Sequence, residues 1–278
     1  MDEIKELENI AKEMRGKIVI AICHAGGGHI APSLSSVEIL VALYFKILKI
    51  DKNNYKQDNR NRFILSKGHA SAALYAVLAK KGIIDENILN TFCQKGSILG
   101  GHPEAPLIPG VEFSTGSLGH GLSLGVGMAF AGKLDKKDYR VFALLSDGEC
   151  QEGSVWEAAM FASHHKLDNL IAIIDHNKLQ SLGRVDEIVS LGPFVDKWKA
   201  FGWGVREVNG HNISEIVDAL ERAPFFKDKP SVLIAHTTKG KGISFMENVP
   251  IWHYRMPNED ELKIVLDELD IGEGELEK

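Results

Sequence analysis

Two polar loops about thirty residues apart carry side chains that could hold a divalent cation. One loop, 147–153, reads Asp-Gly-Glu-Cys-Gln-Glu-Gly and follows the apolar run 139–146, and the other begins at Asn177 after the apolar run 169–175. Such runs predict buried parallel strands, whose following loops emerge at one edge of the sheet. Carboxylate, carboxamide and carbonyl oxygens suit Mg²⁺, and Gly148 would let a phosphate approach the backbone closely. Each loop alone is typical of an ordinary turn, but the pair at this spacing indicates a metal and phosphate site.

Histidines are the second candidate for chemistry, since the chain has eleven of them. Four lie in loops beside glycine, proline or an aromatic residue, namely His29, His69, His102 and His253. Imidazole titrates near neutral pH, so a group of histidines could give and take protons during a reaction. Any one of them alone is better explained as a solvated loop residue. Metal binding by the four is the weaker alternative, because no two of them are spaced i, i+4 on a helix.

The elements that must position these residues follow from the hydrophobic pattern. Strands are predicted at 139–146, 169–175, 204–209 and 231–236, and helices at 4–22, 36–48, 70–82, 119–133, 154–165 and 213–223. The Gly- and Pro-rich stretch 97–118 is predicted to be a long ordered loop. Strands that alternate with helices predict an α/β fold with a mostly parallel sheet covered by helices on both faces.

Composition excludes several classes of protein. The chain has 278 residues, is 44% hydrophobic and 25% charged, and contains no apolar stretch long enough to predict a membrane span. Its net charge of −6 comes from the segment 258–278, which carries nine acidic and two basic residues, so nothing favours nucleic acid as a partner. Three cysteines without a Cys-x-x-Cys pair favour a reducing compartment, and we predict a cytoplasmic protein.

The motifs described above resemble those of thiamine diphosphate enzymes, and of transketolases in particular. The family signature Gly-Asp-Gly…Asn matches with Ser146 in place of the first glycine, and Asp-Gly-Glu-x-x-Glu-Gly is the transketolase form. The resemblance implies the thiamine diphosphate-binding fold, with a metal bound by the side chains of Asp147 and Asn177 and by the carbonyl of Leu179. Mg²⁺ is the expected ion, and Ca²⁺ or Mn²⁺ stay open.

The same resemblance assigns roles to individual residues. His69 and His253 would contact the diphosphate, His29 and His253 would handle the proton of the donor hydroxyl, and His102 would hydrogen-bond the two-carbon unit. The catalytic residues expected are thus His29, His102 and His253, and the expected cofactor-binding set is His69, Gly116, Ser117, Leu118, Gly148, Glu149, Glu152, Asn177 and His253. His120 stands where glutamine is common and is not expected to be catalytic. The lysines of His236-Thr237-Thr238-Lys239-Gly240-Lys241-Gly242 could reach the diphosphate or belong to a solvated turn.

The resemblance extends to about Pro257, which predicts a diphosphate-binding domain at 1–257 and an acidic helix and tail at 258–278. No room remains for the pyrimidine-binding domain of a complete transketolase. We therefore expect a split enzyme that works on sugar phosphates as an α₂β₂ assembly with a C-terminal transketolase subunit. The alternatives are the α subunit of a 2-oxo acid dehydrogenase, which usually has alanine in place of Glu149, a deoxyxylulose-phosphate synthase, or a non-catalytic thiamine diphosphate-binding subunit. A dinucleotide-binding protein is disfavoured, because no Gly-x-Gly-x-x-Gly opens a helix after a strand.

Overall fold

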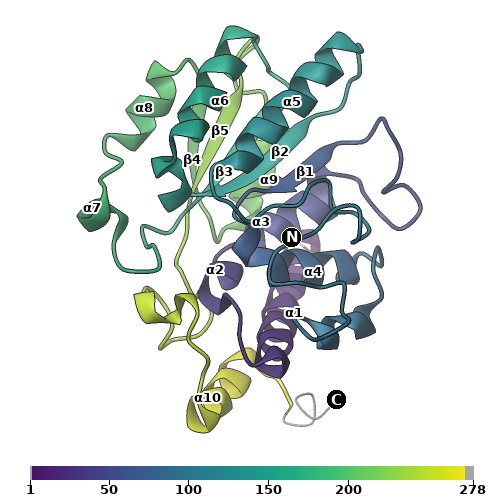
Figure 1. Ribbon diagram of the computed structural model, residues 1–278, viewed down its shortest axis with the longest axis vertical. Helices are drawn as coiled ribbons and strands as arrows, with labels where there is room; N and C mark the ends of the chain where they lie inside the picture. The colour runs from purple at the N-terminus through teal and green to yellow at the C-terminus, as the bar shows by residue number, and fades with distance from the viewer. Residues whose placement is uncertain (1, 273–278) are drawn as a thin grey trace.

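A five-stranded parallel sheet forms the centre of the chain in this computed structural model, which describes residues 2–272 (Figure 1). The strand order is β1-β2-β3-β5-β4, and every neighbouring pair is parallel. The strands are β1 (Arg62–Leu65), β2 (Val141–Ser146), β3 (Leu170–His176), β4 (Gly204–Asn209) and β5 (Ser231–His236). The predicted α/β class with a parallel sheet is confirmed.

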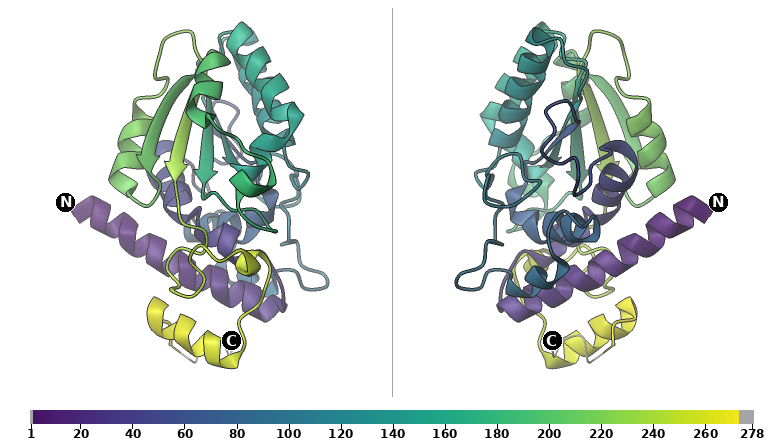
Figure 2. Two further views of the ribbon diagram at one scale, coloured as in Figure 1. Left: turned by 90° about the vertical axis from the view of Figure 1, so that its left-hand side faces the viewer. Right: turned by 90° about the vertical axis from the view of Figure 1, so that its right-hand side faces the viewer.

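Helices cover both faces of the sheet, as the two side views in Figure 2 show. The helices that pack against one face are α5 (His120–Leu134), α6 (Gly153–His164) and α8 (Phe194–Ala200). The opposite face is covered by α1 (Asp2–Ala25), α2 (Ile30–Leu34), α3 (Val37–Ala42), α4 (Ser71–Lys80) and α9 (Ile213–Glu221). The short α7 (Val185–Ile188) lies in the loop after β3, and α10 (Glu259–Leu269) packs on α1.

Alternation along the strands explains why two apolar layers form. Phe142 and Leu144 of β2 belong to the cluster on the α1 side, whereas Ala143 and Leu145 belong to the cluster on the α5 side. Successive side chains of a strand point to opposite faces, so a strand that is apolar at every position must be buried on both. Continuous apolar runs such as 141–145 are therefore the sequence signal of a doubly covered sheet.

Most predicted elements are confirmed to within two or three residues, and two differ more. The predicted helix 36–48 is interrupted, because α3 ends at Ala42 and a π-helical turn follows over Leu43–Ile47. Strand β1 was not predicted at all, since four residues beginning with an arginine carry too little pattern. Loop 97–118 contains no helix or strand, as expected. The acidic segment 258–278 contains α10, and its residues 273–278 lie outside the described part, so the domain boundary at 257 stays a prediction.

All five strands end at the same edge of the sheet, and the loops that follow them carry the predicted site residues. Ser146 of β2 pairs in register with Asp175 of β3, so Asp147 and Asn177 leave adjacent strands side by side. None of the helices formed by residues 2–272 has the length and apolar content needed to cross a bilayer.

Candidate functional site

Asp147 and the loop that begins at Asn177 are joined directly. The Asp147 carboxylate is fully buried, and its Oδ1 accepts a hydrogen bond from the Gly148 N–H (2.7 Å) while its Oδ2 accepts one from the Lys178 N–H (2.5 Å). The Asn177 Oδ1 accepts from the Leu179 N–H at 3.1 Å, which fixes the side chain against its own turn. Burial, aided by the nearby Asp175 carboxylate, raises the pKa of Asp147 to about 7. The pair therefore places a carboxylate and a carboxamide on two loops held together by a hydrogen bond.

These residues fit a divalent cation. A carboxylate can accept about four hydrogen bonds, and each oxygen of Asp147 accepts one from the protein, so lone pairs remain on both. The raised pKa shows that the ionised form lacks sufficient positive charge around it, and a bound cation would supply that charge. The predicted third ligand, the Leu179 carbonyl, accepts a hydrogen bond from Lys239 Nζ at 3.2 Å. A carbonyl oxygen has two lone pairs, so this contact leaves one of them for a metal.

The four predicted histidines converge on one cavity of about 290 Å³, called here the histidine cavity. The ring of His29 lies 5.2 Å from that of His69, 6.0 Å from that of His102 and 5.2 Å from that of His253, measured between ring centroids. Asn177 and Leu179 also line this cavity. The histidines therefore meet beside the candidate metal ligands, although they come from four separate loops.

Burial keeps three of these histidines neutral at neutral pH. It lowers the pKa of His29 to about 4 and that of His253 to about 3, and the nearby Lys239 ammonium adds to both shifts. Burial likewise places the pKa of His69 well below its usual value. Neutral imidazoles can each accept one proton and donate one hydrogen bond, which is what proton transfer requires. Among residues 2–272, no three His, Cys, Asp or Glu side chains gather as metal ligands, so the histidines do not form a metal site of that kind.

Hydrogen bonding fixes the orientation of His253. Its Nδ1 lies 2.9 Å from Lys239 Nζ, and that ammonium also contacts the carbonyls of Leu179 and Gln180. An ammonium only donates, so Nδ1 is the acceptor and the ring proton sits on Nε2. Burial and the nearby Lys67 ammonium lower the pKa of Lys239 to about 8, and Lys239 is therefore mostly charged at neutral pH.

A buried ion pair beneath the cavity was not predicted. Lys67 is completely buried and pairs with Asp175, and it also donates to the Pro32 carbonyl (2.9 Å) and the Ser36 hydroxyl (3.0 Å). Burial acts to raise the pKa of Asp175, but the adjacent Lys67 ammonium outweighs it and holds the pKa at about 2. The pair ties the loops after β1 and β3 to α2. Its only sequence signal was the Lys-Gly-His motif, which was used for His69 alone.

Several predicted cofactor-binding residues have other contacts. The carboxylate of Glu149 is buried and accepts from the Ser66 hydroxyl and from the Gly119 and Ser146 N–H groups, so it ties three loops together. Ser117 is exposed and does not line the histidine cavity, whereas Leu118 and Glu152 do. Gly116 packs so closely on His102 that a Cβ would lie 3.3 Å from the imidazole ring, which explains glycine there. Gly148 also lines the cavity.

The fold and this site define a class of protein. Residues 7–271 match the family model described as "Transketolase, thiamine diphosphate binding domain". The chain belongs to the transketolase family of thiamine diphosphate-binding domains. This membership confirms the transketolase prediction over the dehydrogenase alternative.

Individual relatives narrow the comparison. The chain is 44% identical over 276 residues to a Phocaeicola vulgatus protein whose name makes it one subunit of an apulose-4-phosphate transketolase, covering 99% of this chain and 98% of that protein. It is 43% identical to a Clostridium protein named 6-deoxy-6-sulfo-D-fructose transketolase subunit SqwG, covering 95% and 96% respectively. The structure of transketolase from Campylobacter jejuni superposes with a TM-score of 0.86 at 32% identity, over 96% of this chain but 45% of that one. The chain thus spans the length of the named subunits and less than half of a complete transketolase.

Proposed function

We propose that this chain is the diphosphate-binding subunit of a thiamine diphosphate- and Mg²⁺-dependent transketolase, which moves a two-carbon ketol unit from a ketose phosphate to an aldose phosphate. The observation that carries the proposal is the joined pair of loops, in which a buried carboxylate lacking a compensating cation lies beside four convergent histidines. Asp147, Asn177 and the Leu179 carbonyl would hold the metal. When bound, thiamine diphosphate supplies the stabilised carbanion on which the two-carbon unit is carried.

The chain's own residues account for binding and proton movement. Lys239 is a buried cation whose partners are carbonyl oxygens and an imidazole rather than a carboxylate, so it can also attract a diphosphate. His253 presents a proton on Nε2 and would donate it to a negatively charged oxygen. His29 is neutral and lies within van der Waals reach of this group of rings, so we assign it the acceptor of the donor hydroxyl proton. His102 would hydrogen-bond the two-carbon unit.

The partner is proposed from the comparisons. Two relatives of equal length are named as transketolase subunits, and the chain matches 45% of the complete Campylobacter jejuni enzyme. We propose a separate C-terminal subunit that carries the pyrimidine-binding domain and completes an α₂β₂ enzyme. The donor is proposed to be a ketose bearing a terminal anionic group, as in the names of the two relatives. The three cysteines are free, in keeping with a cytoplasmic enzyme.

Reconstitution tests this function. The purified chain is mixed with its proposed partner, thiamine diphosphate, Mg²⁺, a ketose phosphate and an aldose phosphate, and the new sugar phosphates are quantified. We expect turnover only with both subunits, and a loss of at least a hundredfold in kcat/KM for His29→Ala. Full turnover by the single chain would refute the split arrangement. Decarboxylation of pyruvate without ketol transfer, or unchanged turnover in His29→Ala, would refute the proposed reaction or the role of His29.

A further inference from the structure

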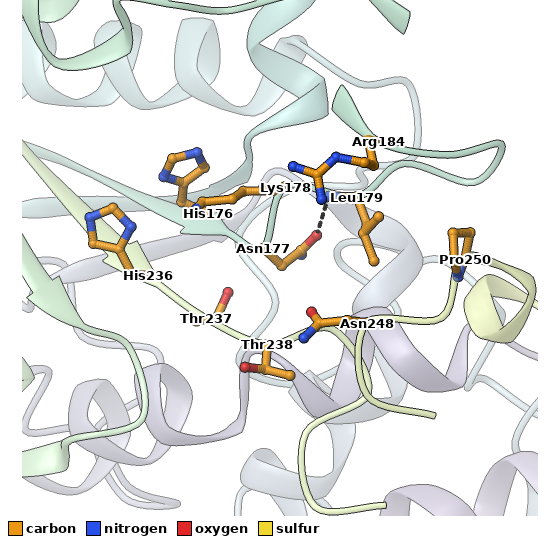
Figure 3. Close-up of a pocket in the computed structure, with 10 residues that line it drawn as sticks. All are labelled: His176, Asn177, Lys178, Leu179, Arg184, His236, Thr237, Thr238, Asn248 and Pro250. Carbon is orange, nitrogen blue, oxygen red and sulfur yellow. Dashed lines mark hydrogen bonds between the residues drawn. The ribbon is translucent and has the colours of Figure 1, made fainter. Parts of the chain in front are cut away.

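A second cavity, larger than the first, opens at the same edge of the sheet. It has a volume of about 560 Å³, and its lining comes from the loops after β3 and β5 and from the segment before the last short helix (Figure 3). The residues are His176, Asn177, Lys178, Leu179, Arg184, His236, Thr237, Thr238, Asn248 and Pro250. Only Asn177 and Leu179 also line the histidine cavity. We call this space the cationic cavity, and the function proposed above does not use it.

The lining of the cationic cavity is suited to an anion. It includes one ammonium (Lys178), one guanidinium (Arg184) and two imidazoles, and none of the ten lining residues is acidic. Thr238 and Asn248 add a hydroxyl and a carboxamide, both of which can donate hydrogen bonds. A divalent cation would find no carboxylate in this lining. An apolar ligand would find only Leu179 and Pro250 as purely apolar side chains.

Two polar groups in this lining are prepared for a ligand. The Nδ1 atom of His176 is buried and has no hydrogen-bond partner, although buried polar atoms normally have one. The neighbouring His236 ring lies 5.2 Å away between centroids, and its Nε2 is 2.8 Å from the Glu207 carboxylate. A carboxylate partner makes Nε2 a donor, so the rest of the ring is held in a fixed orientation. Figure 3 shows the two rings side by side on one side of the space.

The positive groups of the cavity are available for exchange. Arg184 pairs with Asp186 at 3.1 Å, but half of its side chain is exposed. Exposed ion pairs contribute little free energy, so the guanidinium can leave Asp186 for a ligand at small cost. Lys178 is exposed as well. A guanidinium, an ammonium and hydroxyl donors around one space form the usual recognition set for phosphate.

We propose that the cationic cavity binds a small phosphate-bearing molecule, separately from the cofactor. The cavity lies within the size range of small-molecule sites. Because Asn177 and Leu179 form a common wall, a ligand here would contact the segment that carries two of the candidate metal ligands. Occupancy of the two cavities should therefore be thermodynamically coupled, and the coupling must be equal in both directions.

Inorganic phosphate is the probe for the first test. Binding to the full chain is measured by calorimetry in a phosphate-free buffer, and the ring nitrogens of the histidines are followed by ¹H–¹⁵N spectroscopy. We expect saturable binding, shifts at His176 and His236, and a roughly tenfold weaker dissociation constant for Arg184→Met, which is the loss of about one charge-assisted hydrogen bond. Arg222→Met is the matched control, because Arg222 is likewise exposed and paired with an aspartate, Asp218.

Phosphate could instead enter the histidine cavity, and Lys239→Met distinguishes the two sites. Lys239 lines the histidine cavity and not the cationic one. If Lys239→Met abolishes phosphate binding and Arg184→Met does not, or if the shifts fall on His29 and His253, the proposal is overturned. It is also overturned if the wild-type chain shows no saturable binding. None of these outcomes depends on transketolase activity, so the proposed function and this proposal can fail independently.

Discussion

The two cavities share a wall, yet they hold their cations in opposite ways. In the histidine cavity, Lys67 and Lys239 are 0% and 2% exposed, and each is fixed by several hydrogen bonds. In the cationic cavity, Lys178 and Arg184 are exposed, and Arg184 makes only a surface ion pair. Immobilising a long side chain costs conformational entropy, which the first cavity has already lost on folding and the second has not.

This difference distinguishes two kinds of ligand. Donors that are already fixed lose little further freedom when a ligand binds, which favours tight and long-lived binding of a resident cofactor. Exposed cations must be ordered by each arriving ligand, which favours weak and reversible binding. The contrast predicts that substitutions in the histidine cavity change cofactor affinity strongly, and that substitutions in the cationic cavity change it little.

The largest effect is expected for Asp147→Asn. Replacing the buried carboxylate with an amide removes the negative charge that would bind the metal, so Mg²⁺-dependent binding of thiamine diphosphate should weaken by roughly a hundredfold or more, equivalent to about 2.7 kcal/mol. Calorimetric titration with and without Mg²⁺ measures this. Asp218→Asn, at an exposed ion-paired aspartate, is the control and should bind normally. Unchanged Mg²⁺ dependence in Asp147→Asn would show that this carboxylate is not a metal ligand.

Unfolding of the variant cannot explain such a loss, because the pKa shift has the opposite sign. The folded chain holds the pKa of Asp147 at about 7, against an ordinary value of 3.8, so its protonated form stabilises the fold. That stability is complete below pH 4 and is lost as the pH rises through 7. At pH 8 the cofactor-free Asp147→Asn chain should therefore melt no lower than the wild type.

The next largest effect separates the cavities directly. Lys239→Met removes a buried cation beside the Leu179 carbonyl and should weaken thiamine diphosphate binding roughly tenfold. Arg184→Met removes an exposed cation from the other side of the shared wall and should change that affinity by less than about twofold. The same titration serves both variants. Equal losses for both would mean that the two cavities act as one site.

The sequence predicted the frame of this site better than its charges. Strands β4 and β5 were predicted with their observed ends, because β-branched runs stop at glycine, asparagine and threonine. The four histidines and Asp147 were found because they lie in short motifs, and parallel strands bring such motifs to one edge. The burial of Lys67 could not be predicted, since its partner Asp175 is 108 residues away in the chain. The cationic cavity was missed for the same reason, and His176 was interpreted as an ordinary residue.

A third and smaller effect is expected from the contacts that hold the loop of Lys239. The Thr238 N–H donates to His211 Nε2 at 2.7 Å, and His211 Nδ1 is 3.1 Å from Glu38, which also pairs with Arg15 at 2.5 Å. Glu38→Gln should lower the free energy of unfolding by about 1–3 kcal/mol, because it leaves the buried Arg15 without a charged partner. It should weaken cofactor binding only about threefold, since Lys239 itself remains.

Chemical denaturation and calorimetry measure the two effects of Glu38→Gln. Glu13→Gln is its control, because Glu13 pairs with lysines at a partly exposed position, where ion pairs contribute little. If the unfolding free energy falls and cofactor affinity does not change, the Glu38–His211 contacts stabilise the fold without positioning Lys239.

The smallest effect concerns stability against pH. The folded chain lowers the pKa of His29 and His253, both mainly by burial, so the unfolded chain binds protons more readily. Stability is therefore complete above pH 6.5 and decreases as the pH falls toward about 4. Both rings are partly solvated, so we expect the cofactor-free chain to lose only a few degrees in Tm over this range.

The His29→Gln, His253→Gln double variant should remove more of this slope than His176→Gln. Burial also lowers the pKa of His176 to about 4, but His176 is one residue and the histidine cavity contributes at least two. Thermal melts of the three proteins between pH 4 and 7 give the comparison. A larger change for His176→Gln would mean that the cationic cavity, rather than the histidine cavity, is where folding excludes protons most strongly. The distinction between a fixed and an exchangeable site would then have to be abandoned.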